Sequence, residues 1–267
     1  MRMDQEMRAR LSQVRCFLLD MDGTFYLGNR LLEGSLAFLA RLQETGRRAL
    51  FVTNNSSRPA QAYVDKLSRM GVRAPFLNVL TSAQAAARYC LREHAGQRAY
   101  VLCSEPVRAE LEELGLLIDN ERPDYVLATY DTTLTYEKLT RLCDLVRAGL
   151  PFVATHPDLN CPTETGFAPD LGAMLALVEA SAGRRPDVII GKPNAGIVEE
   201  ALRLTGLARE ELAMVGDRLY TDVETGLRFG MLSILVLTGE ATLSDVERTG
   251  VRPDLIFERL SAMNAYL

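Results

Sequence analysis

Short apolar segments recur along the chain, each too brief for a buried helix and each followed by polar residues. Segments of this kind are typical of buried strands in a parallel sheet, which are covered on both faces. Eight segments fit the pattern: residues 16–19, 49–52, 99–102, 125–128, 151–154, 188–190, 213–215 and 233–237. We expect a strand in each of them.

The stretches between these segments are amphipathic, and each runs into a glycine, the residue that most readily adopts the left-handed conformation that ends a helix. The glycines are Gly46, Gly71, Gly96, Gly115, Gly149, Gly183, Gly206 and Gly230. This alternation of strands and helices predicts an α/β fold, with a Rossmann-like, doubly wound parallel sheet. Ligands of such sheets bind beyond the carboxyl ends of the strands, so the residues that follow each strand matter most.

The residues that follow the first expected strand are acidic. Asp20 and Asp22 follow the segment 16–19, and Gly23 allows a sharp turn after them. Side chains alternate along a strand, so the two carboxylates can project to the same side, where they repel unless a metal ion, a proton or a lysine lies beside them. An isolated Asp-x-Asp is about as often a plain polar turn.

Polar residues that suit phosphate or metal binding also follow three later strands. They read Thr53-Asn54-Asn55, Gly191-Lys192-Pro193-Asn194, and Gly216-Asp217 followed by Asp222. Each also has a simple structural explanation when taken alone. Ser56 or Ser57 could cap the helix expected over residues 60–70, Lys192 could be solvated, and Asp222 could cap a helix of its own.

Composition and motif searches exclude several functions. The net charge of −5, from 30 basic and 35 acidic residues, leaves no broad basic face for nucleic acid. No Gly-x-Gly-x-x-Gly occurs, which argues against a dinucleotide-dependent dehydrogenase. Pro186 stands where a Walker motif needs glycine, and Leu31 stands where an EF-hand needs glutamate.

The cysteines and the hydropathy pattern indicate an intracellular protein. The five cysteines are scattered without a Cys-x-x-Cys pair, which fits a reducing compartment. The charged N-terminal segment does not resemble a signal peptide, and no apolar run approaches the ~18 residues of a membrane span. We therefore expect a cytoplasmic protein with no membrane partner.

The four polar segments that follow these strands, taken in order, resemble the motifs of the haloacid dehalogenase (HAD) superfamily of phosphohydrolases. The segments TNNSSR, LTYEKL, ATHPD and GKPN are similar to those of the NagD-like, para-nitrophenyl phosphatase branch of subclass IIA. The interval from Thr53 to Lys192 is several times longer than that from Lys192 to Gly216, so a domain-sized insertion is expected there. The resemblance implies a discontinuous HAD-like core, residues 1–82 and 187–267, and an inserted α/β cap of the C2 type, residues 83–186.

The resemblance also implies a set of site residues. Asp20 would attack phosphorus and form an aspartyl-phosphate, and Asp22 would act as general acid and then as general base. Mg²⁺ would be held by the Asp20 and Asp217 carboxylates and the Asp22 backbone carbonyl. Asp222 would support the waters bound to the metal.

The phosphate would be held by a second set of residues. Lys192 would supply a positive charge, and Thr53, Asn54 and Asn55 would supply hydrogen bonds. His156 stands where many relatives carry asparagine. It would place a titratable donor near the phosphate, which predicts some pH dependence of substrate binding.

The expected function is a Mg²⁺-dependent phosphatase that hydrolyses small phosphomonoesters, such as a sugar phosphate, a nucleotide or pyridoxal phosphate. Two alternatives remain open at this point. One is a mutase or phosphotransferase that uses the same aspartyl-phosphate, and the other is a non-catalytic protein that binds a phosphorylated metabolite on the same fold. The resemblance allows a homodimer and does not require one.

Overall fold

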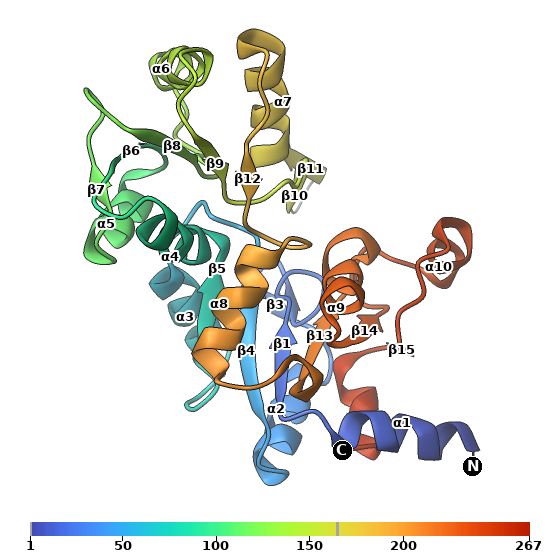
Figure 1. The fold of residues 1–267 in the computed structure, drawn as a ribbon. Helices are drawn as coiled ribbons and strands as arrows, with labels where there is room; N and C mark the ends of the chain where they lie inside the picture. Colours follow the sequence, from blue (N-terminus) through green and yellow to red (C-terminus); the bar gives the residue numbers. More distant parts are fainter. Residues whose placement is uncertain (1, 164–165) are drawn as a thin grey trace. The chain divides into compact units, whose positions relative to one another are not determined.

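The computed structural model describes residues 2–163 and 166–267, and Figure 1 shows their path. The chain packs as two compact units. The first unit comprises the chain as far as Val52, Val64–Leu80 and Ala201–Leu267, and the second comprises Thr53–Tyr63 and Thr81–Glu200. The predicted division into a core, residues 1–82 and 187–267, and a cap, residues 83–186, stays a prediction.

The first unit is built on a six-stranded sheet with the order β15-β14-β13-β1-β4-β5. The pairs from β15 to β4 are parallel. The strands are β1 (Cys16–Leu19), β4 (Arg48–Thr53), β5 (Val79–Thr81), β13 (Leu212–Gly216), β14 (Leu232–Val236) and β15 (Leu255–Phe257). Leu19 of β1 is in register with Val215 of β13, so these two strands end side by side.

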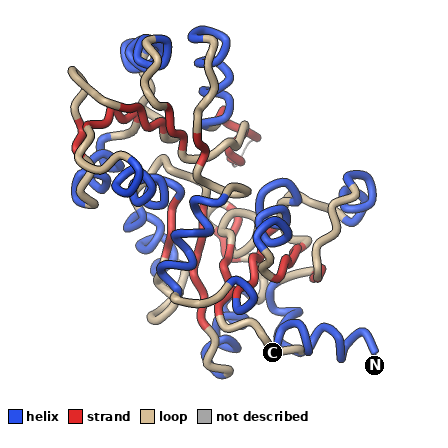
Figure 2. Tube along the Cα trace, viewed as in Figure 1, coloured by secondary structure: helices blue, strands red, loops and turns tan. Residues whose placement is uncertain are grey.

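Helices accompany these strands, as the blue and red segments of Figure 2 show. They are α1 (Arg2–Ser12), α2 (Ser35–Glu44), α3 (Ala60–Arg69), α8 (Ala195–Thr205), α9 (Glu224–Phe229) and α10 (Leu243–Thr249). A short antiparallel hairpin follows β1 and is formed by β2 (Tyr26–Leu27) and β3 (Arg30–Leu31). Helices α3 and α8 each begin in the second unit and end in the first.

The second unit has its own five-stranded parallel sheet, with the order β12-β9-β8-β6-β7. Its strands are β6 (Arg98–Leu102), β7 (Leu117–Ile118), β8 (Tyr125–Ala128), β9 (Phe152–Ala154) and β12 (Val188–Ile189). Its helices are α4 (Ser82–Glu93), α5 (Glu105–Glu113), α6 (Tyr136–Arg147) and α7 (Leu171–Ala182). An antiparallel hairpin of β10 (Asn160–Thr163) and β11 (Gly166–Pro169) lies between β9 and α7.

Each unit has an apolar core. In the first, all four residues of β1 are buried, and the Phe17 ring packs edge-on against Phe38 of α2 at a centroid distance of 5.4 Å. In the second, the strands β6, β8 and β9 pack with α6 and α7 around Phe152, which is fully buried. Burial of these strands on both faces explains why their sequences are continuously apolar.

All eight predicted strands are present, with ends that differ by one residue at most. The eight glycines expected to end helices all have positive φ, between 65° and 104°. The sequence pattern missed β5, β7, β15 and the two hairpins. These elements are only two to four residues long, so they contain too few positions for a periodic signal. In the described part of the chain, no helix is both long and apolar enough to cross a membrane.

The burial of β1 predicts a large effect of truncating one of its side chains. Leu19 is fully buried, so Leu19→Ala should lower the free energy of unfolding by about 2–5 kcal/mol, through lost transfer energy and the cavity left behind. Leu27 is 49% exposed, and Leu27→Ala should change stability by only about 0.5 kcal/mol. Urea unfolding of both variants measures the difference, and equal effects would contradict the assignment of β1 to the core.

Candidate active site

Three carboxylates meet at the carboxyl ends of β1 and β13 in the first unit. Asp20 follows β1 directly, Asp217 follows β13, and Asp222 lies in a one-turn π-helix, Leu219–Val223. One carboxylate oxygen from each lies within 4.8 Å of the others. Asp217 and Asp222 are buried, and Asp20 is half-buried. The cluster is thus a compact set of hard oxygen donors, the kind that binds a divalent cation such as Mg²⁺ or Ca²⁺.

Hydrogen bonds hold the Asp217 carboxylate from two sides. The hydroxyl of Thr24 donates to Oδ1 at 3.1 Å, and the backbone N–H of Glu240 donates to Oδ2 at 2.7 Å. Burial, and after it the negative charge of Asp222, nevertheless raise the pKa of Asp217 to about 6. The carboxylates thus lie close together in a poorly solvated place, and a bound cation would relieve the repulsion between them.

Two glycines make room for these carboxylates. Gly23 has a φ of +84°, and a Cβ there would collide with the Asp217 carboxylate. A Cβ at Gly216 would collide with the Asp222 side chain in the same way. Glycine is therefore required at both positions for the backbone to approach the acidic cluster closely.

Arg218 is a cation close to this cluster. Its side chain is only 14% exposed, and its Nε forms an ion pair with Oε2 of Glu240 at 3.1 Å. Burial alone would lower the pKa of Arg218, but nearby negative charges, first that of Asp20, more than offset it, so the net shift is upward. The guanidinium therefore stays charged and compensates part of the negative charge of the cluster.

Asp22 lies two residues after Asp20, and its carboxylate has charged neighbours that shift its pKa. Burial raises its pKa, whereas Lys66 and a hydrogen bond with the side chain of Tyr26 lower it. The Lys66 ammonium lies 3.7 Å from the centre of the Tyr26 ring, as a cation–π contact. A carboxyl group whose pKa is raised keeps its proton at a higher pH than an ordinary aspartate does, which suits an acid.

The second unit contains the other predicted site residues, and Asn54 connects them. Its Oδ1 accepts the backbone N–H of Lys192 at 2.8 Å, and its Nδ2 donates to the Lys192 carbonyl at 2.9 Å. Thr53 Oγ1 accepts the backbone N–H of Asn55, and Asn55 Oδ1 accepts the hydroxyl of Ser57. Lys192 is only 2% exposed, so the alternative of a solvated lysine is wrong.

The two capping alternatives also differ from the structure. The backbone N–H of Ala60, the first residue of α3, donates to the Glu110 carboxylate at 2.9 Å. Asp222 lies within the π-helix, and the residue that precedes α9 is Val223. Neither the serines before α3 nor Asp222 is thus placed where a plain N-cap would be.

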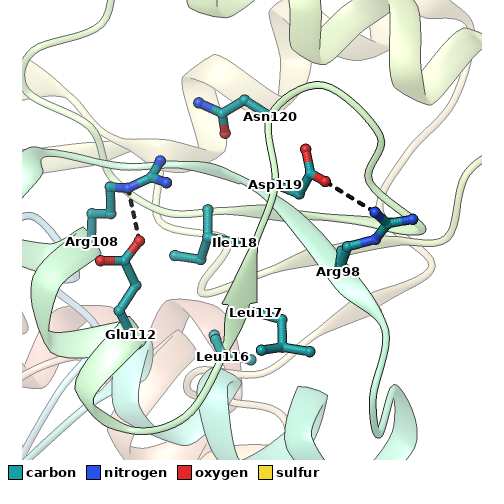
Figure 3. Close-up of a pocket in the computed structure, with 8 residues that line it drawn as sticks. All are labelled: Arg98, Arg108, Glu112, Leu116, Leu117, Ile118, Asp119 and Asn120. Atoms are coloured by element: carbon teal, nitrogen blue, oxygen red, sulfur yellow. Dashed lines mark hydrogen bonds and ion pairs between the residues drawn. The ribbon is translucent and has the colours of Figure 1, made fainter.

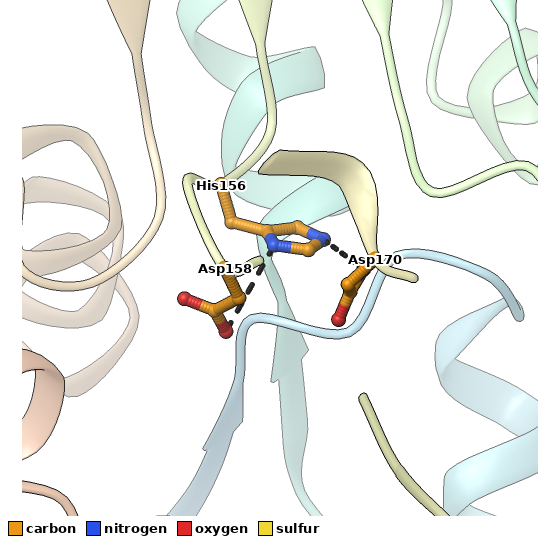
Figure 4. A group of neighbouring side chains, drawn as sticks. All are labelled: His156, Asp158 and Asp170. Atoms are coloured by element: carbon orange, nitrogen blue, oxygen red, sulfur yellow. Dashed lines mark ion pairs between the residues drawn. The ribbon is translucent and has the colours of Figure 1, made fainter. Parts of the chain in front are cut away.

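His156 is fully buried in the loop after β9, between two carboxylates (Figure 4). Its Nδ1 lies 3.9 Å from Asp158 Oδ2, and its Nε2 lies 3.6 Å from Asp170 Oδ1. Asp158 in turn accepts hydrogen bonds from Asn54 Nδ2 at 3.1 and 3.2 Å. The histidine is therefore linked to Lys192 through Asp158 and Asn54.

A pocket of the second unit lies beside the edge strand β7 (Figure 3). Both of its arginines have carboxylate partners. Arg98 pairs with Asp119 at 3.2 Å, and Arg108 pairs with Glu112 at 3.1 Å. The pocket contains none of the predicted site residues, and its charges already compensate one another, so we assign it no role in the chemistry.

The sequence reasoning missed several residues of both groups. Arg218, Glu240, Lys66 and Tyr26 of the first unit, and Asp158 and Asp170 of the second, were not singled out. A signal existed for Arg218, which directly follows Asp217, and for Asp158, which stands two positions after His156. The others come from distant segments that only the fold brings together.

The raised pKa of Asp217 predicts a pH dependence of stability in protein stripped of divalent cations. Between about pH 4 and pH 6 the folded state binds more protons than the unfolded state, so stability falls as pH rises through this window. Asp217→Asn removes the buried charge and should therefore raise the free energy of unfolding at pH 7.5 by about 1–3 kcal/mol. Urea unfolding in EDTA at pH 4.5 and 7.5 tests this, and a variant less stable than wild type at pH 7.5 would contradict it.

Comparison with known proteins places the chain in a family. Residues 17–117 match the family model described as haloacid dehalogenase-like hydrolase, and residues 189–263 match a second one, described as HAD-hydrolase-like. An acid sugar phosphatase from Staphylococcus aureus is 39% identical over 258 residues, which cover 96% of this chain and 99% of that protein.

Solved structures agree with this placement. The 4-nitrophenylphosphatase from Thermotoga maritima superimposes with a TM-score of 0.92 at 47% identity, covering 96% of this chain and 98% of that one. A glycerol phosphate phosphatase from Mycobacterium tuberculosis, in complex with calcium, has a TM-score of 0.87 at 32% identity, covering 95% and 76%. The fold is thus the HAD-like α/β fold with a cap domain. The chain belongs to the haloacid dehalogenase-like hydrolases, in the NagD and 4-nitrophenylphosphatase branch, and is a phosphomonoester hydrolase.

Proposed function

We propose that this protein is a Mg²⁺-dependent phosphatase that hydrolyses small phosphomonoesters through an aspartyl-phosphate on Asp20. The observation that carries the proposal is the cluster of Asp20, Asp217 and Asp222 at the carboxyl ends of β1 and β13. Splitting the hydrolysis into transfer to a carboxylate and release by water replaces one difficult step with two easier ones.

The residues of the cluster fit a divalent cation. Asp20 and Asp217 would bind it through their carboxylates and Asp22 through its backbone carbonyl, while Asp222 would support the bound waters. When bound, Mg²⁺ supplies positive charge that offsets the repulsion between the anionic nucleophile and the anionic phosphate. Arg218 supplies part of the same compensation from the protein itself.

Asp22 is proposed to move the proton. It would give a proton to the leaving oxygen of the ester in the first step and take one from the attacking water in the second. Its raised pKa supports the first of these roles, because burial favours the protonated carboxyl group. Lys66 and Tyr26 act in the opposite direction and favour the carboxylate that the second role needs.

The phosphate is proposed to be held by Lys192, as a positive charge, and by Thr53, Asn54 and Asn55, as hydrogen-bond partners. The double hydrogen bond between Asn54 and the Lys192 backbone supports a common task for these residues. The segments that carry them belong to the unit that contains all of the predicted cap, residues 83–186.

The substrate class is proposed from the relatives. Their names refer to sugar phosphate, 4-nitrophenyl phosphate and glycerol phosphate, all of which are small phosphomonoesters. Among the classes expected from the sequence, we favour sugar or polyol phosphates over nucleotides and pyridoxal phosphate. The five free thiols fit the predicted cytoplasmic location.

A panel of small phosphate esters, assayed with and without Mg²⁺, tests the proposal. Wild-type protein dialysed against EDTA should lose hydrolysis and regain it with Mg²⁺. Asp20→Asn should reduce kcat by at least about 10³-fold, because it removes the nucleophile. Phosphate released should equal ester consumed, since a mutase or phosphotransferase would pass the group to another hydroxyl.

Asp144→Asn is the matched control, because the Asp144 side chain is 58% exposed and should leave the rate unchanged. Full activity of Asp20→Asn would refute the assignment of the nucleophile. Full activity in EDTA would refute the metal. Ester consumption without phosphate release would favour a phosphotransferase instead.

A further inference from the structure

The segment of residues 54–57, which follows β4 and carries part of the proposed phosphate site, is hydrogen-bonded to the carboxyl end of the second unit's sheet. The strands of that sheet are parallel, so they all end at one edge. Ligands of parallel sheets bind at this edge. Here the edge contacts a segment of the chain itself, so the contacts between them decide how that segment is placed.

Two contacts hold the ends of the 54–57 segment. At its start, the side chain of Asn54 hydrogen-bonds both backbone groups of Lys192, which lies after β12. At its end, the carbonyl of Ser57 accepts the hydroxyl of Ser104, which lies after β6, at 3.1 Å. In the sheet, β9 and β8 lie between β12 and β6. The segment therefore runs across the carboxyl ends of four neighbouring strands.

Ser56 holds the middle of the segment on the two central strands. Its Oγ accepts the backbone N–H of Tyr130, which lies after β8, at 2.8 Å. The same oxygen shares a hydrogen bond of 2.8 Å with Oγ1 of Thr155, the residue directly after β9. The side chains of Ser56 and Thr155 are both fully buried. Loss of either hydroxyl would leave the other without this bond in a place that water does not reach, which is costly.

Thr155 also connects Ser56 with the residue that precedes Lys192. The carbonyl of Thr155 accepts the backbone N–H of Gly191 at 2.7 Å. A Cβ at Gly191 would lie 2.6 Å from Asn54 Oδ1 and 2.7 Å from the Thr155 carbonyl oxygen, so the backbones approach closely here. A shift of Thr155 would therefore move Gly191 against Asn54.

The bonds around Asn55 make this residue follow Ser56. The backbone N–H of Asn55 donates to Thr53 Oγ1 at 3.1 Å. Its Oδ1 accepts the backbone N–H of Ser57 at 3.0 Å and the hydroxyl of Ser57 at 2.7 Å. Ser56 lies between the two residues joined by the last pair of bonds. Its anchoring therefore fixes the direction in which the Asn55 amide points.

We propose that Ser56 is a positioning residue for phosphate binding. The pair of hydroxyls on Ser56 and Thr155 holds the segment that carries Asn55 against the segment that carries Lys192. The groups that bind the phosphate are then in place before the substrate arrives, which lowers the cost of binding. Ser56 acts through its neighbours, since its hydroxyl bonds Tyr130 and Thr155. The role deepens the proposed function and rests on it for the tasks of Asn55 and Lys192.

Steady-state kinetics tests the positioning role. Ser56→Ala, and Thr155→Val, which keeps the shape of threonine without its hydroxyl, should each raise the KM for a phosphate ester about tenfold and change kcat by less than about threefold. Thr155→Ser keeps the hydroxyl and should restore the wild-type KM. The double variant should be no weaker than Ser56→Ala alone, because both substitutions remove the same hydrogen bond.

Calorimetric titration with inorganic phosphate, in the presence of Mg²⁺, measures binding without turnover. The dissociation constant should rise about tenfold in Ser56→Ala and in Thr155→Val and stay unchanged in Thr155→Ser. Thr140→Val is the matched control, because the exposed Thr140 hydroxyl bonds only the Tyr136 carbonyl within α6 among its described contacts. Thermal unfolding shows which variants are folded, and the two Thr155 variants decide the outcome if Ser56→Ala is not.

The outcomes separate this role from the proposed function. Wild-type phosphate affinity in folded Ser56→Ala or Thr155→Val, a loss confined to kcat, or a Thr155→Ser variant as weak as Thr155→Val would overturn the positioning role even if the protein is a phosphatase. Wild-type protein that binds no phosphate would overturn it together with the tasks of Asn55 and Lys192. Full activity of Asp20→Asn would overturn the proposed nucleophile, while the phosphate titrations would still decide the role of Ser56.

Discussion

Repulsion among the carboxylates of Asp20, Asp217 and Asp222 is the constraint on which the first unit depends. The parallel pairing of β1 with β13 makes these strands end side by side, so the acidic residues that follow them lie close together. The chain accommodates them with glycines that allow close approach and with hydrogen-bond donors on Asp217. Burial and the charge of Asp222 still raise the pKa of Asp217, so a bound cation would stabilise its carboxylate. A site built in this way favours whatever brings positive charge to it.

The second unit also buries two carboxylates close together. Asp158 and Asp170 are buried, and His156 lies between them, with its ring nitrogens 3.9 and 3.6 Å from their carboxylate oxygens. Asn54 extends this arrangement to Lys192 through hydrogen bonds with both backbone groups of that residue. A buried network of this kind orients its members only while each polar group keeps its partner. The order of Lys192 is therefore expected to depend on Asn54 and Asp158.

The sequence predicted the strands, the helix ends and the polar residues after the strands, because each depends on a local pattern of residues. Continuous apolar runs located the eight main strands, and the glycines located the helix ends, because both follow from burial and backbone sterics alone. Asp20, Asp217 and Asp222 could be placed together because the carboxyl ends of parallel strands share one edge of a sheet. Arg218 and Glu240 could not, since their pairing depends on a loop that returns from β14. The burial of His156 was equally hidden, because it depends on where α7 begins.

The central claim is that Asp20 forms a covalent bond with phosphorus during turnover. Rapid acid quench of the enzyme with a ³²P-labelled ester, followed by peptide mapping, tests it most directly. The account predicts label on the peptide that contains Asp20, formed and lost at rates compatible with turnover and absent from Asp20→Asn. Label on a different residue, or turnover with no labelled enzyme under conditions that trap the intermediate, would contradict it.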